Sequence, residues 1–126
     1  MTILGVGMDI VETKRIAESI ERFGDRFLNR VFLEGEVAYS RSMKFPHLHL
    51  AARFAAKEAI SKAFGTGIGH SMGWRDLEII REPSGAPKVR LHGRAEIFAK
   101  EKNVKEDHIS LSHTAEYGAA SAVIVG

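Results

Sequence analysis

The sequence predicts an α+β fold in which a largely antiparallel sheet packs with one long central helix. Three observations predict it. Apolar runs rich in β-branched residues stand near both ends of the chain, an alanine-rich segment near the middle has the composition of a long helix, and turn signals separate two further apolar runs. The chain has 126 residues without an internal repeat or linker, so we expect a single domain over residues 1–126.

The first quarter of the chain is predicted to form one strand and one helix. Residues 2–11 are mostly apolar or β-branched and predict the strand, and Thr13 is a candidate cap for the helix after it. Gly24 is expected to break or kink that helix. The helix carries an apolar stripe at helical spacing, made of Ile16, Ile20, Phe23 and Phe27.

The middle of the chain is predicted to be helical. Residues 34–41 are a shorter helical candidate, and residues 47–64, which follow Pro46, predict the longest helix because they are rich in strong helix formers. The glycine-rich segment 65–69 ends it. After it, the turn signals and apolar runs predict strands over 77–82 and 87–91, a helix over 92–103, and strands over 108–113 and 117–125.

Composition narrows the classes of protein. The chain is 44% hydrophobic and 27% charged with a net charge of +2, which is typical of a globular protein and does not demand a nucleic acid. It has no cysteine, which excludes disulfides and thiol nucleophiles and suits a reducing compartment. No apolar run approaches the ~20 residues of a membrane span, and the N-terminus lacks signal-peptide features, so we expect a cytoplasmic protein without a membrane partner.

Two acids and a lysine are the strongest functional signal. Asp9 lies inside an otherwise apolar strand, where an unpaired carboxylate is costly to bury, and Glu58 stands one helical turn before Lys62. Two carboxylates from separate elements plus an ammonium suit a Mg²⁺–phosphate site. The alternatives are that Asp9 caps a turn and that Glu58 and Lys62 form a solvated pair. Against the second stand short side chains around the pair, which suggest that something bulky lies there: Ala51, Ala55, Ala59 and Ala63.

Three further segments carry weaker signals. The Gly65-Thr66-Gly67 turn follows a helix and so meets the wrong end of the dipole for an anion, although Lys62 and a metal can outweigh it. Ser112-His113-Thr114 ends a strand and suits either ligand binding or turn formation. Arg15, Arg22 and Arg26 form one basic stripe beside the apolar one, which is either a solvated face or a dock for an acidic partner.

Five motifs carry a resemblance to a known family. They are Gly-Val-Gly-Met-Asp-Ile-Val-Glu at 5–12, Arg-Phe-Ala-Ala-Lys-Glu-Ala-Ile-Ser-Lys-Ala at 53–63, Gly-Thr-Gly-Ile-Gly at 65–69, Gly-Ala-Pro at 85–87 and Ser-Leu-Ser-His-Thr at 110–114. Together they resemble the short, single-domain branch of the 4′-phosphopantetheinyl transferases, in the family's order and over nearly the whole chain. Ala52, where relatives often have glycine, is one departure.

The resemblance implies a reaction and its residues. The phosphopantetheine arm of coenzyme A would move to a serine of an apo-acyl carrier protein, with Asp9 and Glu58 as Mg²⁺ ligands. That Glu58 also acts as the base, directly or through a metal-bound water, is a separate hypothesis based on its place beside the reacting phosphate. Lys62 would contact a CoA phosphate. The rest of the CoA site would comprise Gly65, Thr66, Gly67, Pro87, Ser112, His113 and Thr114. The basic helix that docks the carrier protein would contain Lys14, Arg15, Arg22 and Arg26.

Self-association and two rival functions complete the expectations. The resemblance implies a homotrimer with active sites shared between subunits. A Mg²⁺-dependent phosphohydrolase using the same acids on a nucleotide is the first rival. A basic module that binds an acidic protein or RNA, with structural Asp9 and Glu58, is the second. Metal-dependent turnover distinguishes an enzyme from a module, and the product distinguishes transfer from hydrolysis.

Overall fold

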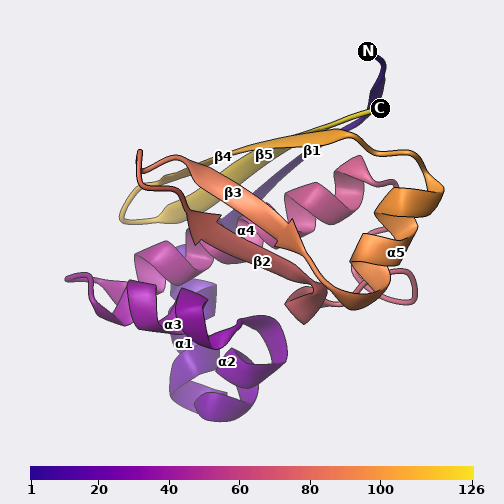
Figure 1. Ribbon diagram of the computed structural model, residues 1–126. Helices are drawn as coiled ribbons and strands as arrows, with labels where there is room; N and C mark the ends of the chain where they lie inside the picture. The colour runs from indigo at the N-terminus through magenta and orange to yellow at the C-terminus, as the bar shows by residue number, and fades with distance from the viewer.

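The computed structural model describes residues 1–126 and confirms the α+β class, with every strand pair antiparallel (Figure 1). The elements, in chain order, are β1 (Ile3–Glu12), α1 (Thr13–Phe23), α2 (Asp25–Val31), α3 (Glu34–Arg41), α4 (Pro46–Ala63), a short 3₁₀ turn (Trp74–Asp76), β2 (Leu77–Arg81), β3 (Pro87–Leu91), α5 (Gly93–Glu101), β4 (Glu106–His113) and β5 (Tyr117–Val125). No helix is both long and apolar enough to cross a membrane.

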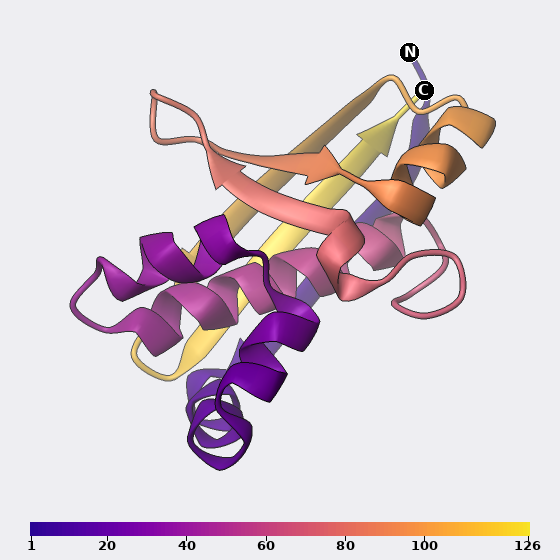
Figure 2. The ribbon, with the colours of Figure 1, turned by 60° about the horizontal axis from the view of Figure 1, so that its bottom comes forward.

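Helix α4 is the centre of the molecule. A three-stranded sheet of order β1-β5-β4 lies along one side of it, and the β2–β3 hairpin forms a second sheet on the β4 side (Figures 1 and 2). Helices α1, α2 and α3 gather around the N-terminal half of α4, whereas α5 lies near its C-terminal half (Figure 2). The two chain ends meet at the same edge, where the backbones of Thr2 and Gly126 exchange two hydrogen bonds of 2.8 Å.

Glycines let the sheet lie directly on the backbone of α4. A Cβ atom added to Gly5 would stand 1.8 Å from the carbonyl oxygen of Ala63, and one added to Gly7 would stand 1.9 Å from that of Ala59. At Gly118 of β5 an added Cβ would lie 2.7 Å from the Ala51 carbonyl carbon. The short side chains on this face of α4 therefore admit the sheet itself, which is the bulky neighbour that the sequence suggested.

The predicted elements are confirmed, with shifts at their ends. Gly24, at φ +55°, breaks the first predicted helix into α1 and α2. The prediction of Thr13 as a cap is wrong: Thr13 is the first residue of α1, and its hydroxyl donates a 2.6 Å hydrogen bond to the Ala115 carbonyl, tying α1 to the β4–β5 turn. The first strand of the hairpin ends one residue early at Arg81, and β4 begins two residues early at Glu106.

One ion pair lies inside the core. The Lys57 ammonium of α4 is 2.8 Å from a Glu36 carboxylate oxygen of α3, and both side chains are at most 1% exposed. Lys57 also donates to the Trp74 carbonyl at 3.0 Å. The Glu36 carboxylate accepts two backbone N–H bonds, from Leu33 at 2.8 Å and from Ile79 at 2.9 Å. This network fastens α4 to α3, to β2 and to the turn before it.

Candidate active site

Asp9 lies on the face of β1 that meets α4. Side chains alternate along a strand, so Asp9 shares this face with Gly5 and Gly7, and it is opposite the buried Ala120 of β5. Its side chain is 18% exposed. Because β1 continues to Glu12, Asp9 is a mid-strand residue, and the alternative that it caps a turn is wrong. The glycine contacts therefore hold a carboxylate against the last turns of α4.

Lys62 pairs with Asp9 across the boundary between strand and helix. Its ammonium lies 2.9 Å from Asp9 Oδ1 and 3.2 Å from the Met8 carbonyl, and the hydrogen bond to Asp9 raises the pKa of Lys62. No ion pair joins Glu58 and Lys62 within 4 Å, so the interpretation of these two as a solvated i,i+4 pair is wrong. The Lys62 ammonium of α4 points to β1 instead.

Glu58 is the third member of this group. Burial raises the pKa of its carboxyl, the negative charge of Asp9 raises that pKa further, and Lys62 opposes both effects. Glu58 and Asp9 are thus close enough to repel each other, with one half-exposed ammonium between strand and helix to balance two carboxylates. Such a pair of acids is stabilised by a further cation.

The donor set suits Mg²⁺. No group of three or more histidine, aspartate or glutamate side chains is placed to hold a metal ion, so the protein alone does not encircle one. Mg²⁺ keeps several waters and is commonly held by one or two carboxylates together with substrate phosphate. Two neighbouring carboxylates that repel each other, beside a lysine able to meet a phosphate, fit that pattern. Asp9 and Glu58 are the residues that would hold the ion.

The Gly65-Thr66-Gly67 turn directly follows this group at the end of α4. Gly65 and Gly67 have φ values of +81° and +67°, and the backbone N–H groups of Thr66 and Gly67 both donate to the Ser61 carbonyl at 3.1 Å. The turn therefore ends the helix, as predicted, and its own bonds occupy those two N–H groups. Its place three to five residues after Lys62 keeps it beside the acids.

The other predicted CoA residues lie elsewhere on the single chain. Ser112 is aligned with Ala119 of β5 and through it with Ile10 of β1, so it shares their face, which is opposite to that of Asp9. His113 is on the α4 side but at the β4 edge, two strands from Asp9. Thr114 accepts bonds from the Glu116 and Tyr117 amides and so closes the β4–β5 turn.

Pro87 is also apart from the acids. It begins β3 and lines a cleft of about 370 Å³ between the hairpin and β4, together with Lys88, Asp107 and His108. Burial raises the pKa of the Asp107 carboxyl in this cleft. One chain thus brings together Asp9, Glu58, Lys62 and the adjoining turn, but it does not bring Pro87 or the Ser112–Thr114 segment to them.

The basic residues are divided between two helices. Lys14, Arg15 and Arg22 lie on α1 and are exposed, whereas Arg26 lies on α2. The prediction of one continuous basic stripe is therefore wrong, because Gly24 turns the chain before Arg26. Arg26 instead lines a hollow of about 230 Å³ with Phe23, Phe27 and Arg30. Of these cations only Lys14 has an acidic neighbour, Glu18 at 3.9 Å.

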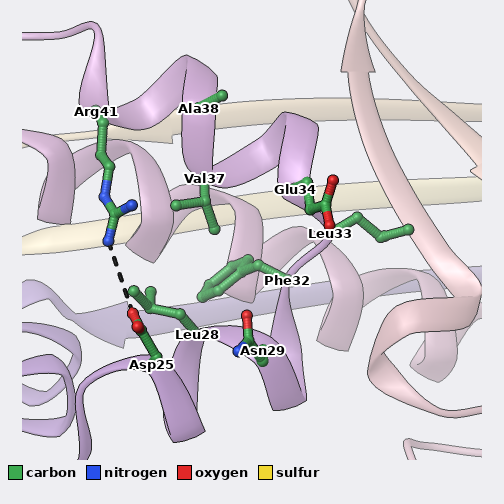
Figure 3. A pocket seen from close by; sticks show the side chains of 9 residues that line it. All are labelled: Asp25, Leu28, Asn29, Phe32, Leu33, Glu34, Val37, Ala38 and Arg41. Atoms are coloured by element: carbon green, nitrogen blue, oxygen red, sulfur yellow. Dashed lines mark ion pairs between the residues drawn. The ribbon is translucent and has the colours of Figure 1, made fainter.

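A second hollow lies between α2 and α3. It has a volume of about 280 Å³ and is lined by Leu28, Phe32 and Val37, with the exposed Asp25–Arg41 pair of 3.9 Å spanning one side (Figure 3). None of the predicted site residues lines it.

Sequence reasoning gave no role to Arg53 and Lys57, although both stand in the 53–63 motif. They are 5% and 0% exposed, and so belong to the interior. Spacing within one helix could not reveal this, because their partners come from α3 and the 3₁₀ turn. The available signal was the motif itself, in which Arg53 and Lys57 stand among small and apolar residues that have the composition of a buried helix.

Comparison with known proteins decides the family. A sequence profile for the 4′-phosphopantetheinyl transferase superfamily matches residues 5–120. The chain belongs to this superfamily. A holo-[acyl-carrier-protein] synthase of Koribacter versatilis (strain Ellin345) is 48% identical over 97% of this chain and 98% of its own. One of Moorella thermoacetica is 48% identical over 97% of this chain and 94% of its own.

Solved structures of the superfamily share the fold. The holo-[acyl-carrier-protein] synthase of Neisseria meningitidis superposes with a TM-score of 0.92 at 31% identity, covering 99% of this chain and 100% of its own. That of Helicobacter pylori, in complex with coenzyme A, gives a TM-score of 0.85 at 31% identity over 95% and 99% of the two chains. The phosphopantetheinyl transferase fold expected from the motifs is therefore confirmed.

Proposed function

We propose that this protein transfers the 4′-phosphopantetheine group of coenzyme A to a serine of an apo-acyl carrier protein and releases adenosine 3′,5′-bisphosphate. The observation that carries the proposal is the Asp9–Glu58–Lys62 group, which the contact between β1 and α4 holds together. Membership of the superfamily and the holo-[acyl-carrier-protein] synthase relatives support the same reaction.

The chemistry is an in-line displacement at phosphorus. The serine oxygen of the carrier bonds to the phosphorus that bears the pantetheine arm, and the bond from that phosphorus to the leaving adenosine 3′,5′-bisphosphate breaks. Bound Mg²⁺ would neutralise charge on the pyrophosphate. Asp9 and Glu58 would hold that ion, and the Lys62 ammonium, released from Asp9, would bind a phosphate oxygen.

Glu58 is our candidate for the general base. The serine hydroxyl must lose a proton, and a carboxylate whose pKa is raised towards the working pH accepts a proton more readily. The carrier supplies the nucleophile, so the enzyme needs no serine or cysteine of its own for the reaction. In this scheme the Glu58 carboxylate takes the serine proton directly or through a water.

We further propose a homotrimer in which neighbouring chains complete each site. The outer face of β1 carries Val6, Met8 and Ile10, which are 66%, 72% and 64% exposed, an unusual row of apolar side chains to leave in water. Ser112 lies on that same outer face. Association over this face would cover the apolar row, and in the proposed trimer Ser112–Thr114 and Pro87 of one chain would complete the site of an adjacent chain. Sedimentation of a fully active monomer would contradict this arrangement.

The basic residues of α1 and α2 are the proposed dock for the carrier. Lys14, Arg15, Arg22 and Arg26 favour an acidic protein over neutral partners. A net charge of only +2 does not favour nucleic acid. We expect the reaction in the cytoplasm, since a chain without cysteine suits reducing surroundings.

Intact-mass spectrometry tests the function directly. An apo-acyl carrier protein is incubated with the protein, coenzyme A and Mg²⁺, beside samples with EDTA and with Asp9→Asn. A metal-dependent gain of one phosphopantetheine, lost by at least about a hundredfold in the variant, is expected. Cleavage of CoA without a change in the carrier would indicate the phosphohydrolase. Unchanged CoA and carrier, with several carriers tried, would indicate the binding module.

A further inference from the structure

The loop that joins α4 to the 3₁₀ turn, residues 64–73, lies beside α5 in both views of the molecule (Figures 1 and 2). Its first part is the Gly65–Gly67 turn, which is tied to the last turn of α4. Its last part is fixed by Met72, whose side chain is fully buried. Between these anchors Gly69 and His70 are exposed, and a 2.9 Å hydrogen bond from the Gly69 N–H to the Met72 carbonyl closes the segment.

One side chain from outside the loop holds this exposed segment. The Arg94 guanidinium of α5 donates a hydrogen bond to the Gly69 carbonyl at 3.2 Å and another to the His70 carbonyl at 2.7 Å. Both bonds start from Nη1, whose two hydrogens diverge in the plane of the guanidinium, so the two carbonyls are held in a fixed relation. No other residue outside the loop forms a hydrogen bond with residues 69–71.

Asp76 keeps Arg94 in this position. The Oδ2 atom of Asp76 lies 3.6 Å from Arg94 Nε and accepts the Gly73 N–H at 2.8 Å. A Cβ atom added to Gly73 would stand 2.9 Å from Arg94 Nη2, and one added to Gly93 would stand 2.9 Å from Asp76 Oδ1. Two glycines thus leave the room that the ion pair occupies, and the pair joins α5 to the loop and to the turn before β2.

This arrangement matters more for the loop than for the stability of the fold. The Arg94 side chain is 56% exposed, and an ion pair as exposed as this one contributes little to folding. What Arg94 determines is the conformation of two exposed peptide groups in a segment without helix or strand. The held segment starts two residues after the Gly65–Gly67 turn, which adjoins the acids. Loosening the segment would give that turn more conformations.

We propose that Arg94 is a positioning residue for the donor substrate: by holding two loop carbonyls it keeps the loop after Lys62 in the conformation that receives coenzyme A. This inference rests on the proposed function, in which a donor phosphate meets Lys62 and the donor lies along the Gly65–Gly67 turn. A loop that is already ordered loses little entropy when the donor binds, whereas a loose loop must be ordered at that moment. Arg94 therefore changes the affinity for the donor without touching it.

The expected kinetic signature is a change in KM for coenzyme A alone. The apparent affinity falls in proportion to the fraction of molecules whose loop is correctly placed, and kcat is unaffected because bound substrate and transition state need the same loop conformation. Carrier recognition is also unaffected, since α1 and α2 surround the N-terminal half of α4 and α5 lies near the other half (Figure 2). Arg94→Ala should raise KM for coenzyme A about five- to tenfold and leave kcat and KM for the carrier within about twofold.

Amide hydrogen exchange measures the loop itself in the absence of every substrate. The Gly69 amide is bonded to the Met72 carbonyl and is protected while the segment is held. In Arg94→Ala this amide should exchange about tenfold faster than in the wild type. Amides in the middle of α4 and of β5 should keep their wild-type rates, because a local opening of the loop leaves the core closed.

Further variants separate positioning from a purely structural role. Arg94→Lys keeps the charge but not the planar pair of donors, and should recover part of the affinity that Arg94→Ala loses. Asp76→Asn still accepts the Gly73 N–H but attracts Arg94 less, and should raise KM for coenzyme A about two- to threefold. If both residues act through the same contact, the double variant of Asp76→Asn and Arg94→Ala should be no worse than Arg94→Ala alone.

The matched control is Arg90→Ala. Arg90 of β3 lies 3.7 Å from Glu78 and its side chain is 61% exposed, close to the 3.6 Å and 56% of the Arg94 pair, but Arg90 forms no bond to the loop. This variant should leave both the exchange of the Gly69 amide and KM for coenzyme A at their wild-type values.

Calorimetric titration of coenzyme A with Mg²⁺ and without carrier distinguishes this inference from the proposed function. Binding that is about five- to tenfold weaker in Arg94→Ala, with Arg90→Ala unchanged, is the expected result. Equal affinity in Arg94→Ala and the wild type, an equal loss in Arg90→Ala, or faster exchange throughout the core would overturn the positioning role and leave the transferase reaction standing. A wild type that binds no coenzyme A would overturn both.

Discussion

Lys57 and Glu58 are adjacent residues of one helix, but their charged groups have opposite surroundings. Lys57 points into the core and meets Glu36 at 2.8 Å, with both side chains at most 1% exposed and every charge matched by a partner. Glu58 points towards β1 beside Asp9, where two carboxylates share one half-exposed lysine. One step along the helix thus separates a satisfied ion pair that fixes the fold from an unsatisfied group that awaits a ligand.

The same contrast distinguishes the two ends of α4. Residues 49 and 58 are about 13 Å apart at 1.5 Å per residue. Near residue 58 the acids outnumber the cations, and near residue 49 the buried Nε of Arg53 has no hydrogen-bond partner. An unmatched charge costs folding free energy unless a ligand compensates it, so unmatched charge indicates function more reliably than charge alone.

Breaking the matched pair should have the largest effect. Lys57→Met leaves the Glu36 charge buried without its cation and should lower the free energy of unfolding by about 3–5 kcal/mol. Urea unfolding of the purified variant measures this. The matched control is Lys62→Met, which removes a half-exposed cation from Asp9 and should cost less than about 1 kcal/mol. Equal losses in the two variants would show that the buried pair stabilises the fold no more than the exposed pair does.

The contact between sheet and helix on the active-site side gives the next largest effect. Gly7→Ala puts a methyl group 1.9 Å from the Ala59 carbonyl oxygen, and separating β1 from α4 should cost about 3 kcal/mol. The comparison variant is Gly65→Ala, where the added methyl meets nothing and only φ of +81° is unfavourable, at about 1 kcal/mol. Thermal unfolding distinguishes them. If Gly7→Ala unfolds at the wild-type temperature, β1 can move away from α4 without loss of stability.

These residues also show which features of the structure could be predicted from the sequence. The strand with its aspartate, the long helix and the turn after it were predictable because propensity, periodicity and breakers are local properties. The partner of Lys62 was not, since Asp9 is 53 positions away and the competing Glu58 pair was equally well spaced. The Lys57–Glu36 pair was hidden for the same reason: its members come from α4 and α3, which only tertiary packing brings together.

Charge reversal on α1 should change carrier recognition without touching the acids. The double variant Arg15→Glu, Arg22→Glu should raise KM for the carrier about tenfold, leave kcat within about twofold and weaken the salt dependence of kcat/KM. Lys100→Glu with Lys102→Glu, on the far side at α5, makes the same reversal at two positions and should leave KM near the wild-type value. A similar KM rise in both would mean that total charge matters and that α1 is not the dock.

The smallest effect is a stability gain at the active site itself. Because the pKa of Glu58 is raised in the folded protein, ionising Glu58 costs stability, and this cost appears as pH rises through the folded-state pKa. Glu58→Gln cannot ionise, so without metal it should melt about 1–3 °C above wild type at pH 7.5 and equal it near pH 4. Mg²⁺ should reverse the order, because it binds and stabilises only the chain with both carboxylates. Melting curves in EDTA and in Mg²⁺ test both statements, and a variant less stable than wild type in EDTA would show that the Glu58 carboxylate already has a partner.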